Sequence, residues 1–163
     1  MVCYNFDLDH WRNTCKLNGV GFVMLTLTTP KSKKDVETFL LEWQSIYTKC
    51  MEDNCKYALL FDTRKVESFD LSYLGLMADW LKRVKGLTEK WMERTAIVVS
   101  NPFIKTFIGL VFKIYKPVRP FKVFGGGETQ RAMEWALSTQ EGDDPESIKC
   151  QNNIKAFGFI EEK

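Results

Sequence analysis

Histidine is almost absent from this chain, and the short motifs that mark common enzymes are absent as well. His10 is the single histidine among 163 residues, and it has no serine or cysteine context such as a G-x-S-x-G nucleophile elbow. The glycine run at 125–127 lacks both the spacing of a dinucleotide fingerprint and a following Lys-Ser/Thr pair. We therefore expect no catalytic triad, and we interpret the glycine run as a hinge between a strand and a helix.

Paired cysteines are also missing. The five cysteines are odd in number and scattered, and the one close pair, Cys50 and Cys55, has no second pair to complete a zinc site. No secretory signal pattern precedes them, and free thiols are typical of reducing compartments. We expect free cysteines, no metal, no cofactor and a cytoplasmic, intracellular location.

Long apolar runs and a strong net charge are the remaining absences. The longest apolar run, 103–115, is interrupted by Lys105 and Lys113, and it falls short of the ~20 residues that a helix needs to cross a bilayer. The net charge of +2 predicts no binding to nucleic acid. Charge is nevertheless uneven, because residues 82–122 hold ten Lys or Arg and two Glu. We expect a soluble protein, with peripheral membrane association as the alternative.

What the chain does contain is a regular alternation of strand and helix patterns. Period-two and buried apolar runs predict strands, and apolar spacings of three and four predict helices. Since helices between strands make right-handed crossovers, we expect one α/β domain over residues 1–138, a sandwich with a largely parallel sheet of four or five strands and helices mainly on one face. Residues 139–163 are interpreted as an acidic linker followed by a tail or an edge strand. The expected strands are 2–8, 20–28, 57–61, 95–99 and 121–124, and the expected helices are 36–50, 74–84, 102–115 and 128–137.

Finer expectations concern the ends of these elements. Strands 2–8 and 20–28 are expected to form a hairpin, and the segment Asp62-Thr63-Arg64 is expected in the loop after its strand. Asp70 or Ser72 is placed to cap the second helix, and Gly86 to end it. Asp62 and Asp70 flank one loop, where a carboxylate can hold a metal or act as a base; helix capping explains Asp70 equally well.

The third helix is apolar over more than one face. If this helix were buried against a sheet, some of its large apolar side chains would still face outward. This favours one of two interpretations, a contact with the core or with a second copy of the chain, or a contact with a lipid surface. In the second interpretation Phe103, Phe107 and Val111 contact acyl chains. The basic side chains of Lys105, Lys113, Lys116 and Arg119 then contact anionic head groups.

Several segments together resemble the STAS domain and its anti-sigma-factor-antagonist-like relatives. They are LLFDTR at 59–64, FDLSYLGLMADWLK at 69–82, AIVVSN at 96–101, PVRPFKVF at 117–124 and ETQRAMEWAL at 128–137.

In that family a D-S-S-G-L-G pattern opens a helix, and its second serine is a phosphorylation switch. Here D-L-S-Y-L-G puts Asp70, Ser72, Leu74 and Gly75 at matching positions, and the departures are Leu71 and Tyr73. The resemblance implies a non-catalytic regulatory module that binds a protein partner through Asp70, Ser72 and Tyr73. A phosphate there would be stabilised by the helix N-terminus, although a capping role alone also explains Ser72.

Residues 94–124 are similar to the C-terminal half of CRAL-TRIO lipid-binding domains. The likeness rests on R-x-A-I-V-V-x-N-P-F, an apolar helix and K-P-V-R-P-F-K-V-F. It implies a lipid held between the sheet and a mobile apolar helix. The first functional hypothesis is thus a STAS-type protein-binding module, with a homodimer as one form. The alternative is a lipid-binding or membrane-associated module, and an enzyme of unknown class is the third.

Overall fold

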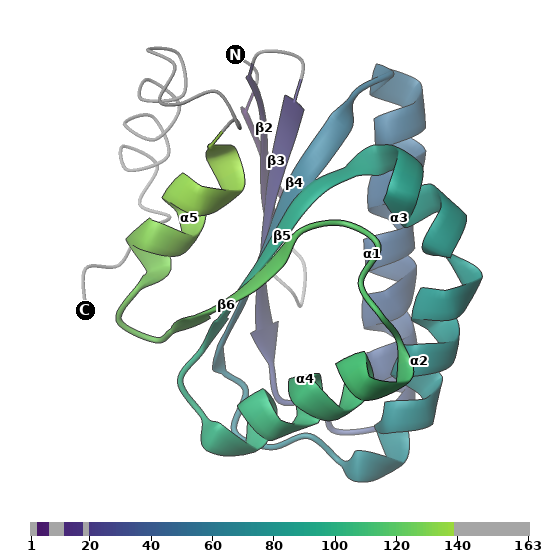
Figure 1. Ribbon diagram of the computed structural model, residues 1–163, viewed down its shortest axis with the longest axis vertical. Helices are drawn as coiled ribbons and strands as arrows, with labels where there is room; N and C mark the ends of the chain where they lie inside the picture. Colours follow the sequence, from purple (N-terminus) through teal and green to yellow (C-terminus); the bar gives the residue numbers. More distant parts are fainter. Residues whose placement is uncertain (1–2, 7–11, 18–19, 139–163) are drawn as a thin grey trace.

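A mixed β-sheet forms the centre of the computed structural model, which describes residues 3–6, 12–17 and 20–138 (Figure 1). Within these residues the sheet has six strands that follow one another in chain order. Strands β1, β2 and β3 pair antiparallel, and β3, β4, β5 and β6 pair parallel. The expected α/β class with a largely parallel sheet is therefore confirmed. The strands are β1 (Cys3–Phe6), β2 (Arg12–Leu17), β3 (Val20–Thr28), β4 (Lys56–Lys65), β5 (Met92–Val99) and β6 (Phe121–Gly125).

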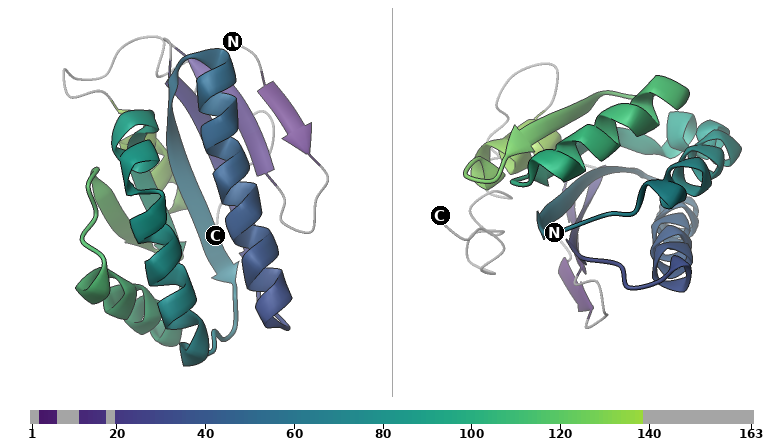
Figure 2. Two further views of the ribbon diagram at one scale, coloured as in Figure 1. Left: turned by 90° about the vertical axis from the view of Figure 1, so that its right-hand side faces the viewer. Right: turned by 90° about the horizontal axis from the view of Figure 1, so that it is seen from below.

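The helices cover the two faces of the sheet unequally, as expected. Four of them, α1 to α4, pack on one face, and α5 packs alone on the other (Figures 1 and 2). Helix α1 begins at an N-cap, Ser32, whose hydroxyl accepts a hydrogen bond from the backbone N–H of Asp35. The helices are α1 (Lys33–Asp53), the short 3₁₀ turn η1 (Leu71–Tyr73), α2 (Leu74–Arg83), α3 (Lys85–Trp91), α4 (Pro102–Ile114) and α5 (Thr129–Leu137).

The core is divided into two layers by the alternation of side chains along the strands. On β4, Tyr57, Leu59 and Phe61 point toward α1 to α4, whereas Ala58 and Leu60 point toward α5. All five are buried. Because both faces of a parallel strand are covered, β4 reads as a nearly continuous apolar run.

The expected N-terminal hairpin was wrong in its pairing. The segment Arg12–Leu17 forms strand β2, which lies between β1 and β3, so the strand at Val20–Thr28 pairs with β2 and not with β1. The sheet accordingly gains a strand beyond the four or five expected. The sequence RNTCKL is too polar to suggest a buried strand, but an antiparallel strand near a sheet edge tolerates polar residues.

Two predicted boundaries were also wrong. Asp62, Thr63 and Arg64 lie inside β4, which continues to Lys65. Gly86 does not end a helix, because the break between α2 and α3 falls at Val84 and Gly86 belongs to α3. A Cβ atom at Gly86 would meet nothing within 4 Å, so no close contact requires glycine there. The proposed tail, residues 139–163, lies outside the described residues.

Candidate functional site: a cavity under helix α4

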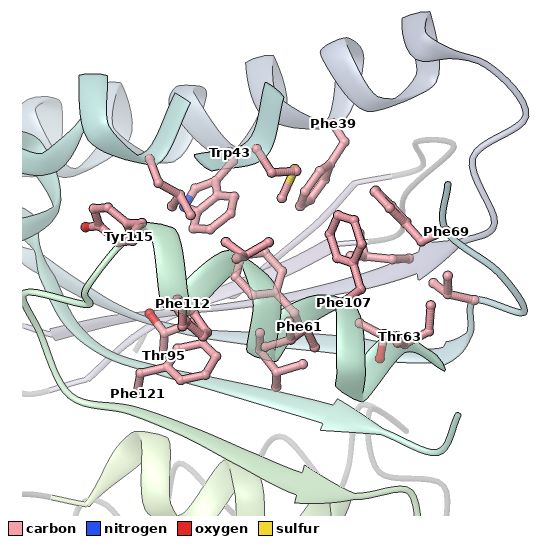
Figure 3. Close-up of a pocket in the computed structure, with 18 of the residues that line it drawn as sticks. Phe39, Trp43, Phe61, Thr63, Phe69, Thr95, Phe107, Phe112, Tyr115 and Phe121 are labelled. Atoms are coloured by element: carbon pink, nitrogen blue, oxygen red, sulfur yellow. The ribbon is translucent and has the colours of Figure 1, made fainter. Parts of the chain in front are cut away.

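An apolar cavity of about 140 Å³ lies between the sheet and helices α1, α2 and α4 (Figure 3). Helix α4 forms the wall that faces the strands. Protein interiors are normally packed without voids of this size, and an engineered apolar cavity of ~150 Å³ stays dry and binds benzene. The space therefore suits a small apolar group. Aromatic side chains make up much of its wall: Phe39, Trp43, Phe61, Phe69, Phe107, Phe112 and Phe121.

The cavity exists because α4 stands away from the strands beneath it. Ile97 occupies the middle of β5, between two other parallel strands, yet it is only half-buried and lines the cavity. Its neighbours Ala96 and Val98 point to the α5 face and are 0% exposed. A central parallel strand is normally covered on both faces, so the exposure of Ile97 marks incomplete coverage on the α4 side.

Helix α4 is fixed by specific contacts near its beginning and farther along. Asn101 caps the helix, since its side-chain oxygen accepts from the N–H of Phe103 at 2.9 Å and its amide nitrogen donates to the carbonyl of Glu67 at 2.6 Å. Farther along, the ring of Phe112 meets that of Phe121 on β6 with 4.2 Å between centroids. These contacts hold α4 in place over the cavity.

The two ends of the cavity carry opposite charges. Among the described residues that line it, Asp35 and Arg119 are the charged ones. Asp35 follows the carboxyl end of β3 and accepts a hydrogen bond from the backbone N–H of Lys31 at 2.7 Å. Arg119 lies beside the start of β5, where its Nε–H donates to the carbonyl oxygen of Met92 at 2.9 Å. Strands β3, β4 and β5 run parallel to one another. The carboxyl end of β3 and the start of β5 therefore lie at opposite ends of the strands.

Tyrosine hydroxyls lie toward the Arg119 end. Tyr115 lines the cavity there, at the opposite end of Figure 3 from Phe69, and its buried hydroxyl has no hydrogen-bond partner among the described residues. The hydroxyl of Tyr47 lies 2.6 Å from that of Thr88. Burial raises the pKa of Tyr47 to about 12, although the bond to Thr88 works in the other direction. Burial likewise raises the pKa of Tyr115, with a smaller effect of Glu89.

The lipid-contact residues expected on α4 do not form one surface. Phe107 and Val111 are buried and line the cavity, whereas Phe103 is 78% exposed on the outside of the helix. Arg119 lines the cavity. The outer basic side chains are all exposed: Lys105, Lys113 and Lys116. The single surface expected from the sequence is thus divided between an inner wall and an outer face.

The expected partner-binding residues lie at the start of α2, outside the cavity wall. The carboxylate of Asp70 accepts a hydrogen bond from the backbone N–H of Ser72 at 2.8 Å, and this bond, together with one from the Ser72 hydroxyl, lowers the pKa of Asp70. Ser72 is exposed. The half-buried ring of Tyr73 meets the edge of Phe69, with 5.4 Å between centroids.

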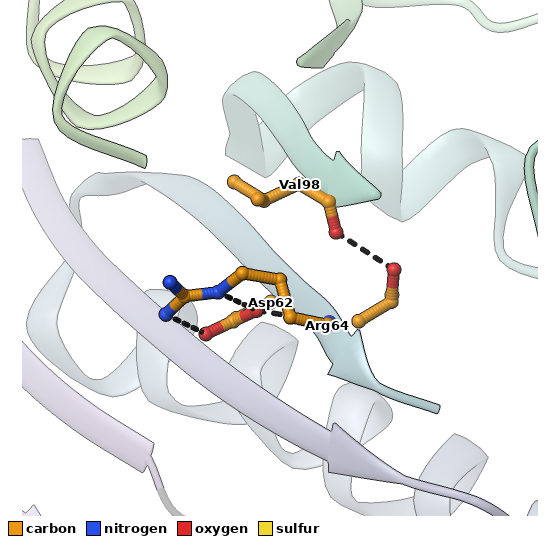
Figure 4. A network of polar contacts seen from close by, with 4 residues as sticks. Asp62, Arg64 and Val98 are labelled. Atoms are coloured by element: carbon orange, nitrogen blue, oxygen red, sulfur yellow. Dashed lines mark hydrogen bonds and ion pairs between the residues drawn. The ribbon is translucent and has the colours of Figure 1, made fainter. Parts of the chain in front are cut away.

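The two carboxylates considered for catalysis do not share a pocket. Asp62 lies on the α5 face of β4, is 3% exposed, and is bound by Arg64 through contacts of 2.9 and 2.7 Å (Figure 4). Thr63 points the other way and donates to the carbonyl of Val98 at 2.7 Å. Asp70 is exposed to solvent. Within residues 3–6, 12–17 and 20–138, no three His, Cys, Asp or Glu side chains gather in a way that would hold a metal ion.

Comparison with known proteins gives no further information about the site. No family model matches this chain, and no curated protein and no solved structure is significantly similar to it. The STAS and CRAL-TRIO resemblances therefore remain predictions. In the part of the chain that the structure describes, no helix has the length and apolar character that a membrane crossing requires.

Most walls of the cavity were not identified from the sequence. Phe39 and Trp43 fit the apolar stripe of α1, and Phe61 fits a buried strand, a pattern that is typical of core residues. The one sequence feature that points to these walls is the density of aromatic residues. Phe39 and Trp43 are four positions apart and therefore lie on the same face of a helix. Nothing in that pattern indicates that α4 stands away from the sheet.

Proposed function

We propose that this protein binds a small apolar or amphipathic molecule in the cavity between the sheet and helix α4. The observation that carries the proposal is the cavity itself, an apolar space of about 140 Å³ walled by aromatic side chains. Empty apolar space destabilises a fold, and its cost increases with its volume. Apolar pockets are also the usual places where proteins bind small molecules. The CRAL-TRIO resemblance supports the same interpretation, because that family binds lipid beneath an apolar helix.

The size of the cavity limits the ligand. A benzene-sized molecule fills an apolar space of ~150 Å³, so a chain of about six to eight carbons fits with α4 in its present position. A longer acyl chain requires α4 to move outward or the chain end to leave the cavity. We therefore expect medium-length ligands to bind without displacement of α4.

Native mass spectrometry tests the proposal. The purified chain is measured before and after incubation with octan-1-ol, and again after denaturation. We expect a bound small molecule, either copurified or added, that is lost on denaturation. An Ile97→Phe variant fills part of the cavity and should bind less, whereas Leu41→Phe, at a position 67% exposed on α1, should bind normally. If native protein takes up no small molecule, or if both variants bind equally, the proposal is wrong.

A STAS-type module that binds a protein partner is the second candidate. It is favoured by the position of Ser72, exposed and hydrogen-bonded to Asp70 at the beginning of α2. A phosphate there would be stabilised by the positive end of the helix dipole. The test uses the Ser72→Asp and Ser72→Ala variants as baits and compares the partner proteins that each one binds. A partner that binds one variant and not the other supports this candidate, and identical partner sets contradict it.

A further inference from the structure

We infer that the ligand of this cavity is an amphiphile with a carboxylate head group, and that Arg119 binds this head group. The inference rests on the proposed function and adds the ligand's charge and orientation. Arg119 lines the cavity and is half-buried at its edge. Arg119 therefore lies where the apolar space meets solvent, as the residue that binds an anionic head must.

The guanidinium is held in place but retains donors. Its Nε–H donates to the carbonyl of Met92 at 2.9 Å, and Nη2 donates to the carbonyl of Glu93 at 3.4 Å. The Nη1 group has no hydrogen-bond acceptor among the described residues. The guanidinium is thus fixed along its Nε–Nη2 edge and free along its Nη1 side. A guanidinium held in this way is pre-organised for two parallel N–H bonds to an oxyanion.

The surrounding charge favours an anion with a single negative charge. Residues 99–127 contain five basic residues and no Asp or Glu, so the segment that contains Arg119 is positive. Among the described residues, the carboxylate paired with Arg119 is that of Glu93, whose Oε2 lies 3.8 Å from Nη2, which is a long and weak contact. A phosphate monoester carries nearly two charges at neutral pH and would meet more repulsion from Glu93 than a carboxylate does.

The other end of the cavity sets the orientation. Asp35 is one of the lining residues at that end, and its negative charge disfavours an anionic head there, so the apolar tail occupies that part of the space. The tail then lies along the aromatic wall formed by Phe107 and Phe39. The ligand class consistent with this arrangement is a medium-chain fatty acid, with its head at Arg119.

Calorimetric titration with octanoate and with octan-1-ol at pH 8 tests the inference. These probes have the same chain length and differ in the charge of the head group. We expect octanoate to bind about tenfold more tightly than the alcohol, as charge-assisted hydrogen bonds to a fixed arginine imply. Octyl phosphate is the third probe, and we expect it to bind more weakly than octanoate.

Three variants separate a head-group contact from a structural role. Arg119→Gln should remove the preference for octanoate and leave binding of octan-1-ol unchanged. Glu93→Gln removes the neighbouring negative charge and should strengthen octanoate binding several-fold, a gain that misfolding cannot produce. Lys116→Gln, an exposed change outside the cavity lining, should leave the preference intact.

The outcomes distinguish this inference from the proposed function. If native protein binds neither octanoate nor the alcohol, the proposed function and the inference both fail. If it binds both probes equally, or if Arg119→Gln weakens both to the same extent, the cavity binds ligands but Arg119 does not recognise a head group. A preference for octyl phosphate over octanoate would overturn the assignment of a carboxylate.

Discussion

The ring of Phe69 packs against the ring of Phe107 with 4.5 Å between their centroids. Phe69 belongs to the segment that leads to Ser72, and Phe107 belongs to the inner face of α4. The same segment is bound to the start of α4 by the hydrogen bond between Asn101 and Glu67. The two regions that sequence patterns single out for function are therefore neighbours in the fold, joined by this aromatic contact and this hydrogen bond.

We predict that Phe69→Ala loosens α4 more than it loosens the rest of the protein. Removal of the half-buried ring should lower the free energy of unfolding by about 2 kcal/mol. Hydrogen exchange should accelerate in the amides of α4 and less in those of α5, which packs on the other face of the sheet. Leu71→Ala, at a position 63% exposed, is the control and should change neither quantity. Uniform acceleration across both helices would contradict the local role of Phe69.

Tyr47 should make stability fall at alkaline pH. Its pKa is raised from 10 to about 12 in the folded state, chiefly by burial, so the unfolded chain loses the phenolic proton first. The associated stability is fully present below pH 10 and is lost as the pH rises toward 12. Tyr57 acts in the same direction, because burial and its hydrogen bond to Asp53 raise its pKa as well.

The Tyr47→Phe variant isolates this contribution. At neutral pH it should be less stable by about 1 kcal/mol, since the bond to Thr88 is lost. Above pH 10 its stability should decline less steeply than that of the native protein. Urea unfolding measured from pH 7 to pH 11 gives both results. Parallel curves for the two proteins would mean that Tyr47 does not carry the pH dependence.

Cys50 should resist alkylation in the folded protein. Its side chain is 0% exposed, and burial, followed by the proximity of Cys55 and Asp53, raises the pKa of its thiol to about 12. Because the thiolate is the reacting species, iodoacetamide at pH 8 should modify Cys50 only after unfolding in urea. Peptide mapping by mass spectrometry provides the measurement. Modification of Cys50 in the folded protein, without urea, would contradict this prediction and show that α1 opens locally.

Gly21 should tolerate no side chain. A Cβ atom at this position of β3 would collide with the ring of Tyr57, its partner on β4. The ring is buried and its hydroxyl donates a hydrogen bond to the carboxylate of Asp53 at 2.7 Å, so the ring has little freedom to move. Gly21→Ala should therefore cost about 2 kcal/mol of unfolding free energy. Gly75→Ala, in α2 where a Cβ meets nothing within 4 Å, is the control and should not destabilise the protein, since Ala favours a helix more than Gly does.

The order of elements could be predicted from the sequence because each element carries a local signal. The spacing of Val36, Phe39 and Leu40 indicates α1, and the Asn101-Pro102 pair indicates the start of α4, where the structure places it. Strand β2 could not be predicted, since its stability depends on pairing with β1 and β3 and not on its own pattern.

The candidate site was accessible to sequence reasoning only in part. The excess of apolar residues on α4 predicted a lipid or interface role, but periodicity does not show which of Phe103 and Phe107 points inward. That choice depends on how α4 crosses the sheet and on the contact with Phe69. The cavity depends on a separation between helix and strands that side-chain identity alone does not encode.

Methyl NMR of the native protein during titration with octan-1-ol tests the central claim most directly. If the ligand enters the cavity, chemical shifts change for the methyl groups of Ile97, Ile104 and Val111, which line it, and stay constant for the exposed Leu41 and Ile114. Shifts confined to the exposed methyl groups, or no shifts at saturation, would contradict the proposal that this fold holds an apolar ligand beneath α4.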